Sequence, residues 1–328
     1  MDRKFRTISF IYFIFIFSIL SIPSLVIFAE FANFSRIDKS LTYIYSSSTP
    51  PFEKELNLNT DVGIIDIKYT TQPVDYLIRI DLKIEMAGPN LIGKSYLDFF
   101  NIVWENFTSP ANFTLEIISD MLEEFWNLHK TNIIINITLR ADIIFDINAF
   151  IIERAIELAN LRGITANNLF LNVDRGNINY DFKHCTIEGN ITGTVNYGNI
   201  TLKSYNNQFT QNSKLTFINN LGNTLIDIYQ YEEIGANITG TASTKTGIIH
   251  LIYKDDSPNI GAQIILYNKT THGAEGQNTW EGFERAISPL SAGQYYNSTD
   301  FPAQNNYYFS LFKWDGGDYL WNLYSIPL

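Results

Sequence analysis

Four related stretches decide the fold of this chain: GNINYDF at 176–182, GNITLKS at 198–204, GNTLIDI at 222–228 and GIIHLIY at 247–253. Each begins with a glycine, and the intervals between these glycines are 22, 24 and 25 residues. Self-similarity at such a period is typical of a repeat architecture, in which each unit buries its apolar face against its neighbours. We therefore interpret residues 165–258 as a stack of repeats.

The residues after each glycine alternate between apolar and polar. The second, fourth and sixth positions are Ile178, Tyr180, Phe182; Ile200, Leu202, Ser204; Thr224, Ile226, Ile228; and Ile249, Leu251, Tyr253. Period-two alternation indicates a strand with one buried face. A second alternating run precedes each glycine, so each repeat supplies two strands and two turns. The pattern predicts an all-β chain with a short parallel β-solenoid, and antiparallel hairpins with glycine turns are the alternative.

The fifth position of the repeats gives a test of register. It reads Asp181, Lys203 and Asp227, so in a parallel stack these alternating charges become neighbours on adjacent strands. Gly63, which precedes Ile65 and Ile67, offers a fifth and separated copy of the repeat.

The recurring triplets carry a resemblance to a known family. Gly176-Asn177-Ile178, Gly189-Asn190-Ile191 and Gly198-Asn199-Ile200 resemble the repeats of the putative-adhesin family, also called toastrack domains. The resemblance covers about residues 165–254 and, more weakly, 59–148. It implies a β-solenoid on an exported, membrane-anchored protein, and it supplies no catalytic residues.

The N-terminal segment, residues 1–30, predicts where the protein is located. Arg3, Lys4 and Arg6 precede an uncharged run from Ile8 to Ala29, which is long enough as a helix to cross a bilayer. The positive-inside rule then makes this a single-pass protein of the cell membrane with an extracellular C-terminal domain. A cleaved signal peptide is the main alternative, and a buried core helix is a third.

The remaining regions are divided by composition and periodicity. Residues 31–58, with Pro50 and Pro51, are predicted to be a linker, and 59–148 a β-rich region in which 77–86 and 135–147 alternate strictly. Helices are predicted at 119–129 and 149–161, the latter within a connecting segment at 149–164. Residues 259–328 form an aromatic-rich C-terminal β region or cap, with a hairpin predicted around 314–318.

Charge and cysteine content exclude several classes of protein. The chain has a net charge of −11, and residues 2–6 contribute +2 of that, so the rest carries −13 and is not expected to bind nucleic acid. Cys185 is the only cysteine, so no internal disulfide forms, and its apolar context predicts a buried side chain. Sequons for N-glycosylation occur at Asn33, Asn106, Asn112, Asn136, Asn190, Asn199, Asn237, Asn268 and Asn297. Strand phase directs Asn112 and Asn136 outward.

No motif for catalysis, a cofactor or a metal ion is found, so we expect a protein that is not an enzyme. A polysaccharide-active enzyme is the weakest alternative. Trp314, Tyr319 and Trp321 are candidates for an aromatic surface that stacks on sugars, or for a cap on the end of the solenoid. The expected function is an adhesin-like module that binds a glycan or another cell-surface ligand. A structural cell-envelope component that acts by self-association is the other reading.

Overall fold

The structure is a computed structural model that describes residues 34–47, 53–89, 91–108, 111–119, 130–255, 257, 259–268, 279–281, 283–286, 293–298, 300–313 and 318–325. They fall into two compact units. Unit 1 draws its described residues from Met1–Ser40, Lys83–Phe100 and Asp120–Asn132, and unit 2 from Leu41–Leu82, Asn101–Ser119 and Ile133–Leu328.

Almost all regular structure is strand. The strands are β1 (Phe34–Tyr45), β2 (Glu53–Thr70), β3 (Ile78–Pro89), β4 (Phe100–Thr108), β5 (Ala111–Ser119), β6 (Lys130–Arg140), β7 (Ile144–Arg162), β8 (Thr165–Ala166), β9 (Leu169–Lys183), β10 (Thr186–Ile187), β11 (Ile191–Tyr205), β12 (Gln208–Phe209), β13 (Ser213–Leu221), β14 (Thr224–Gln230), β15 (Ile238–Thr246), β16 (Ile248–Asp255), β17 (Ile260–Asn268), β18 (Thr279–Glu281), β19 (Phe283–Ala286), β20 (Gly293–Ser298), β21 (Asn305–Lys313) and β22 (Asp318–Ser325). A 3-10 helix, η1, spans Tyr96–Asp98.

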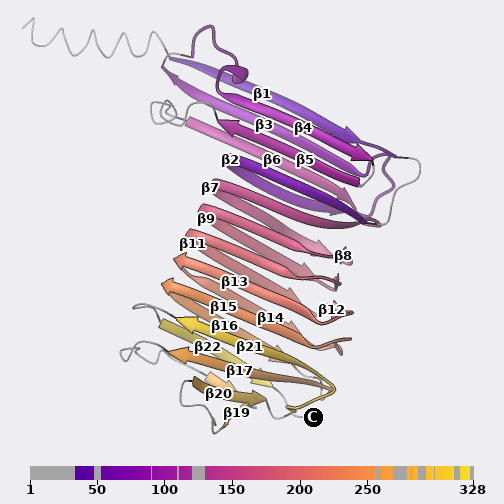
Figure 1. The fold of residues 1–328 in the computed structure, drawn as a ribbon, viewed down its shortest axis with the longest axis vertical. Coiled ribbons are helices and arrows are strands. Elements are labelled where there is room, and N and C mark those ends of the chain that lie inside the picture. Colours follow the sequence, from indigo (N-terminus) through magenta and orange to yellow (C-terminus); the bar gives the residue numbers. More distant parts are fainter. Residues whose placement is uncertain are drawn as a thin grey trace, which may run out of the picture. The chain divides into compact units, whose positions relative to one another are not determined.

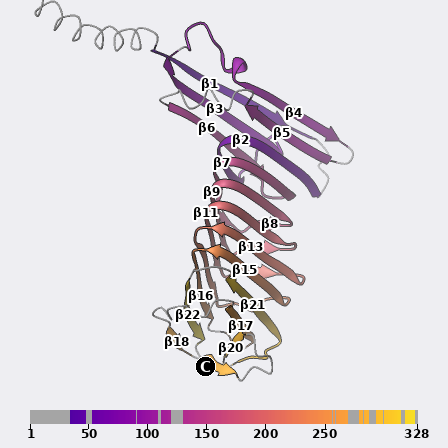
Figure 2. The same cartoon turned by 60° about the vertical axis from the view of Figure 1, so that its left-hand side comes forward.

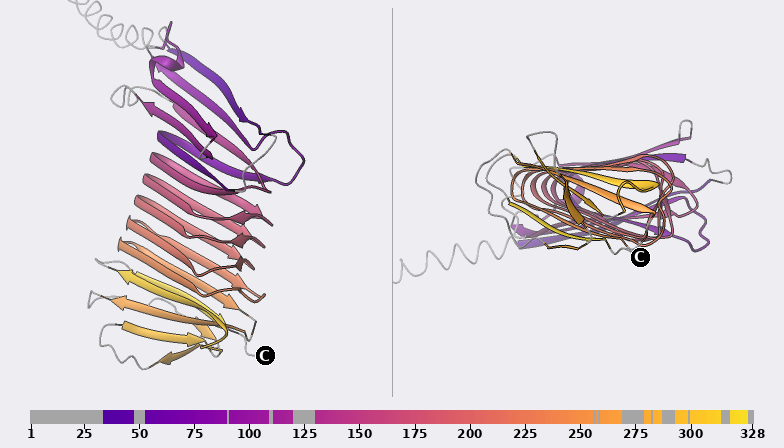
Figure 3. Two further views of the ribbon diagram at one scale, coloured as in Figure 1. Left: turned by 45° about the vertical axis from the view of Figure 1, so that its right-hand side comes forward. Right: turned by 90° about the horizontal axis from the view of Figure 1, so that it is seen from below.

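Unit 2 is a stack of coils, and each coil contributes a strand to each of two parallel sheets (Figure 1). The long strands β2, β7, β9 and β11 bend once and take part in both sheets, whereas later coils divide into the pairs β13 and β14, β15 and β16, and β21 and β22. Figure 2 shows β16 and β22 at one side of the stack and β15 and β21 at the other. Seen along the stack, the coils lie over one another as a flattened loop (Figure 3).

The register between coils is the one that the repeat predicts. Gly198 pairs with Gly176 and Ile200 with Ile178, and the strands run parallel. The alternative of antiparallel hairpins is therefore wrong for the repeats. All residues of the predicted apolar stripe are buried between the sheets. Full burial of an aliphatic or aromatic side chain contributes about 1.5–3 kcal/mol, so the apolar members of the stripe stabilise the stack.

Glycine is required at the corner between the two sheets. The backbone of Gly176, Gly198, Gly222 and Gly247 has φ between 139° and 150°. A Cβ atom at these positions would lie 1.4–2.0 Å from a carbonyl oxygen of the preceding coil. Gly63 has the same conformation, φ 143°, which confirms it as a separated copy. Arg154 occupies the equivalent position in β7, in register with Gly63 and Gly176.

The C-terminal end of unit 2 adds another coil and then changes pairing. β21 pairs in parallel with β15, and β22 with β16, so the hairpin predicted around 314–318 is wrong. β17 pairs with the far side of β21, and β20 and β19 continue that sheet in antiparallel orientation. Tyr307 and Phe309 of β21 are buried and stack with ring centroids 5.9 Å apart. These aromatic residues fill the core of this coil, and the role of the segment as a cap stays a prediction.

Unit 1 is small and carries a group of linked ion pairs. Arg36 forms ion pairs with Asp38 at 3.0 Å and with Glu85 at 3.6 Å, and Lys83 contacts the same Glu85 at 2.6 Å. At η1, the backbone N–H of Ser95 donates to Asp98 at 2.6 Å.

Two predictions of local structure are wrong. Residues 149–161 lie within β7 rather than in a helix. Before the bend at Arg154 the odd-numbered residues are buried, such as Ile151, and just after it the even-numbered ones, such as Ile156. This change of phase gives buried residues a spacing that resembles that of a helix, which explains the wrong prediction. In the predicted linker, residues 34–45 form β1, and β2 already begins at Glu53. Of the predicted helix at 119–129, only Ser119 is described, and it is the last residue of β5. The rest of that segment lies outside the described residues.

The predicted membrane anchor, residues 1–30, also lies outside the described residues. Within the part of the chain that the structure describes, no helix combines the length and apolar character needed to cross a membrane.

Candidate ligand-binding surface

A row of basic and tyrosine residues runs across the outer face of one sheet, which the second halves of β7, β9 and β11 form with β14 and β16 and which we call the second sheet. Arg162, Lys183, Tyr205, Tyr229 and Lys254 occupy equivalent outward positions near the ends of β7, β9, β11, β14 and β16. We call these five residues the Lys–Tyr row. Each of the five directly follows the last residue of the apolar stripe, or Leu161 in β7, so in-register stacking alone brings them together.

The two tyrosines of the row lie between two lysines. The ring centroids of Tyr205 and Tyr229 are 6.3 Å apart, with an interplanar angle of 26°. Lys183 Nζ lies 5.9 Å from the Tyr205 centroid, and Lys254 Nζ lies 5.7 Å from that of Tyr229. Since the four residues follow one another on adjacent strands, each ring lies between a lysine and the other ring. Cation–π attraction and ring stacking each contribute on the order of 0.5–1 kcal/mol at such sites.

The corner after the second sheet adds two more rings to the row. His184 and Asn206 adopt left-handed φ values of 50° and 51° at equivalent positions of consecutive coils. His184 packs edge-on against Tyr205, with ring centroids 5.4 Å apart. The Asn206 carboxamide oxygen accepts the backbone N–H of Tyr231 at 3.1 Å, and Tyr231 in turn contacts Tyr205 at 5.6 Å and Tyr229 at 6.5 Å.

The cations of the row have no carboxylate partner. Among the described residues, no Asp or Glu lies within 4.0 Å of the charged groups of Arg162, Lys183 or Lys254. The hydroxyl groups of Tyr205 and Tyr229 make no hydrogen bond to any described residue either. This line of cations leaves its donors available to a ligand, although the chain has 34 acidic and only 23 basic residues.

The predicted charge ladder lies two residues before the row. Lys203 is in register with both Asp181 and Asp227, as predicted. However, none of the described ion pairs at 4.0 Å or less includes Lys203. The three residues are therefore aligned as predicted, but Lys203 forms no ion pair with either aspartate. Burial raises the pKa of Asp227, while Lys203 and then His250 act in the opposite direction.

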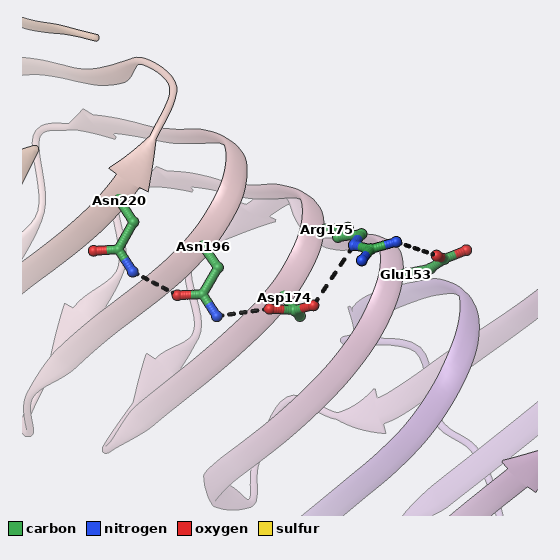
Figure 4. Close-up of polar contacts among 5 residues, drawn as sticks. All are labelled: Glu153, Asp174, Arg175, Asn196 and Asn220. Atoms are coloured by element: carbon green, nitrogen blue, oxygen red, sulfur yellow. Dashed lines mark hydrogen bonds and ion pairs between the residues drawn. The ribbon is translucent and has the colours of Figure 1, made fainter. Parts of the chain in front are cut away.

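A second polar series lies one or two residues before the corner residue of each coil, and its members bond to one another (Figure 4). Asn220 donates to Asn196 and Asn196 to Asp174, each at 2.6 Å. Arg175 lies 3.8 Å from the other oxygen of Asp174 and 3.4 Å from Glu153. Because these groups bond to one another from coil to coil, we assign the series a structural role.

Asparagine is also frequent at the corners because its side chain links successive coils. The carboxamide oxygen of Asn177 accepts the backbone N–H of Asn199, and that of Asn199 accepts the N–H of Asn223, both at 3.0 Å. Asn190 does the same for Lys214 at 2.9 Å. The Gly-Asn-Ile triplets thus have a physical cause, and so do several of the sequons.

The sequons differ in accessibility. Asn106, Asn136 and Asn199 are exposed; Asn112, Asn190, Asn237 and Asn297 are half-buried; Asn33 and the side chain of Asn268 lie outside the described part of the chain. Asn136 is thus exposed, as strand phase predicts. Asn112 alternates with buried neighbours, but its carboxamide donates to Glu55 at 3.3 Å and accepts from Asn57 at 2.9 Å. Glycosylation itself remains a prediction.

The aromatic residues predicted to stack on sugars lie largely outside the described part of the chain. Trp314 lies outside the described residues, as do the side chains of Tyr319 and Trp321. In register, Tyr319 pairs with Ile249 and Trp321 with Leu251, both of which are buried. Cys185 is buried, its thiol donates to the Leu161 carbonyl at 3.3 Å, and burial raises its pKa, so it is a poor nucleophile. Among the described residues, no group of three or more His, Cys, Asp or Glu is placed to hold a metal ion.

Reasoning from the sequence missed the Lys–Tyr row, although the signal was present. The seventh position after each glycine reads Lys183, Tyr205, Tyr229 and Lys254, one pleat beyond the apolar stripe. The contribution of His184 and Tyr231 had no such signal, because it depends on the geometry of the corner.

Comparison with known proteins finds distant likenesses to solved structures. No protein-family model matches the chain, and neither does any curated protein. Similar solved structures include a "putative cell adhesion protein" of Clostridium sporogenes, with 14% identity, a TM-score of 0.34, and coverage of 88% of this chain and 100% of that one. A "putative adhesin" of Bacteroides fragilis has 14% identity, a TM-score of 0.33, and coverage of 89% and 98%. A "putative lipid binding protein" of Parabacteroides distasonis has 11% identity, a TM-score of 0.30, and coverage of 86% and 96%. These likenesses identify neither a family nor a ligand for the chain.

Proposed function

We propose that this chain is an adhesin-like module that binds a cell-surface glycan through the Lys–Tyr row. An N-terminal anchor at residues 1–30 holds it in the cell membrane with the solenoid outside. The observation that carries the proposal is the line of unpaired ammonium, guanidinium and phenol groups on the outer face of the second sheet. The basic residues before the uncharged run 8–29 support the location.

A glycan fits this surface better than a protein partner does. The row is narrow, straight and formed by donors, whereas the centre of a protein interface is usually apolar and well packed. A polysaccharide is itself linear and presents oxygen acceptors along its length. Binding by hydrogen bonds along one line requires no cavity and no movement of the sheet.

Loss of the two tyrosines provides the test. The full-length chain in detergent is screened on a glycan array, and the bound glycan is then titrated against the double variant Tyr205→Ala with Tyr229→Ala. We expect affinity to fall about tenfold or more, because truncation of a central interface tyrosine typically costs over 1 kcal/mol. Tyr197→Ala is the matched control, since Tyr197 is also on β11, is 54% exposed and lies outside the row.

Equal binding by both variants would place the ligand elsewhere on the molecule. No glycan binding, together with concentration-dependent self-association in sedimentation experiments, would instead favour a structural component of the cell envelope.

A further inference from the structure

We propose that the ligand of the Lys–Tyr row is a linear acidic polysaccharide that carries carboxylates along its length, and that it is bound by donors rather than by stacking on the rings. This inference rests on the proposed function and specifies the class of ligand. The inference is based on the contacts by which neighbouring side chains of the row pack against the faces of the tyrosine rings.

The faces of both tyrosine rings are already occupied. Tyr205 has Lys183 on one side and Tyr229 on the other, and Tyr229 has Tyr205 and Lys254. A sugar ring that stacked on either face would have to displace a lysine or the other tyrosine. The row therefore presents outward the ring edges, two hydroxyl groups and two ammonium groups.

The outward groups are hydrogen-bond donors at a regular spacing. Neighbouring strands lie about 4.7–4.9 Å apart, so the row from Lys183 to Lys254 extends over about 14 Å. Arg162 extends the line of cations by one more strand. A line of this length is longer than a single sugar, so it suits a polymer that places an acceptor opposite each donor.

Charge complementarity selects an acidic polymer. Arg162, Lys183 and Lys254 have no carboxylate within 4.0 Å among the described residues, while other described cations such as Arg79 and Arg140 are paired. A protein with a net charge of −11 repels polyanions in general, so binding must depend on this local line and must weaken as salt screens it.

The experiment compares two forms of one polymer. Binding of the full-length chain to polygalacturonate is measured by calorimetry beside its fully methyl-esterified form, which has the same backbone without the charge. We expect the ester to bind at least tenfold more weakly. Hyaluronate and alginate extend the set of acidic ligands, and single-stranded DNA tests for unspecific attraction to polyanions.

Two double variants separate the donors from the rings. Tyr205→Phe with Tyr229→Phe keeps the stack and removes the hydroxyls, and Lys183→Gln with Lys254→Gln removes the charges. We expect each pair to weaken binding to the acidic polymer about three- to tenfold, since contacts of exposed groups are screened by water and are individually modest. Lys214→Gln with Lys245→Gln has the same change in charge at exposed sites outside the row and should bind as the wild type does.

The inference and the proposed function can fail separately. Equal binding of the ester, or full affinity in the Phe variant, would overturn the inference and leave a neutral-glycan adhesin standing. Equal binding of DNA would overturn it in favour of unspecific attraction to polyanions. Binding to no acidic polysaccharide, with retained binding to a neutral glycan on the array, would also overturn the inference alone. Binding to no glycan would overturn both.

Discussion

Arg154 stands where the other corners of unit 2 have glycine, and its φ of 108° is one that side chains rarely adopt. Strained backbone of this kind costs on the order of 1–3 kcal/mol, part of which Arg154 recovers through its contacts. We expect Arg154→Gly to stabilise the protein by about 1 kcal/mol, measured as a higher urea midpoint at unchanged slope. Gly198→Ala is the opposite case: its Cβ would lie 1.7 Å from the Gly176 carbonyl oxygen, so the midpoint should fall sharply. A lower midpoint for Arg154→Gly would show that its contacts outweigh the strain.

Lys54 is a charged residue at a core position of β2. Its side chain is 3% exposed, it pairs in register with the buried Phe145, and its ammonium lies 5.1 Å from the Tyr45 ring and 5.0 Å from the Phe113 ring. No described residue accepts a hydrogen bond from it. Burial lowers the pKa of Lys54 in the folded protein, so the amine loses its proton at a lower pH there than in the unfolded chain.

Lys54→Met should therefore stabilise the protein at neutral pH by about 1 kcal/mol, because the thioether keeps the ring contacts and removes the buried charge. The sign of the pH effect follows from the lowered pKa. Wild-type stability should rise with pH between the folded-state pKa and the ordinary value of 10.5, and the Met variant should lack this rise. Urea titrations at a series of pH values measure both effects. A destabilised Met variant would mean that cation–π attraction dominates at this site.

At the level of the element, the corners of the solenoid differ in how much asparagine side chains contribute to their stability. Asn207 is fully buried; its carboxamide oxygen accepts the Cys185 N–H at 2.8 Å, and its nitrogen donates to Ser204 at 2.8 Å and to the Phe182 carbonyl at 3.3 Å. Asn199 makes similar links between coils, but it is exposed to water.

Asn207→Ala should cost about 2–4 kcal/mol, because it leaves buried backbone groups without partners. Asn199→Ala should cost less than about 1 kcal/mol, since water replaces the lost bonds. Thermal unfolding of the two variants under identical conditions gives the comparison. If the two variants lost similar amounts of stability, burial would not determine how much these asparagines stabilise the protein.

The sequence predicted the strands of the repeats well because each has one buried face and one polar face. It failed at residues 149–161, where the bend at Arg154 joins two strand phases and no glycine marks the corner. It also failed at 34–45, where the alternation of β1 is weak because few of its side chains are buried. The pairing of β17 with β21 depends on contacts distant in sequence, which local periodicity does not contain.

For the molecule as a whole, the proposed location predicts a mass. The protein purified from its host's membranes should have a peptide mass of 37.6 kDa with residues 1–30 retained, and glycan-sized additions if the exposed sequons are used. Mass spectrometry of the intact chain before and after removal of glycans measures both. A peptide about 3 kDa lighter would indicate a cleaved signal peptide and a released protein.

The claim that the Lys–Tyr row is the binding surface is tested most directly by lysine acetylation footprinting. The full-length chain is acetylated with and without saturating polysaccharide, and the modification of each lysine is read by mass spectrometry. The account predicts that the ligand protects Lys183 and Lys254 and leaves Lys214 and Lys245 as reactive as before. Saturable binding without protection of Lys183 and Lys254, or with equal protection of all four lysines, would contradict it.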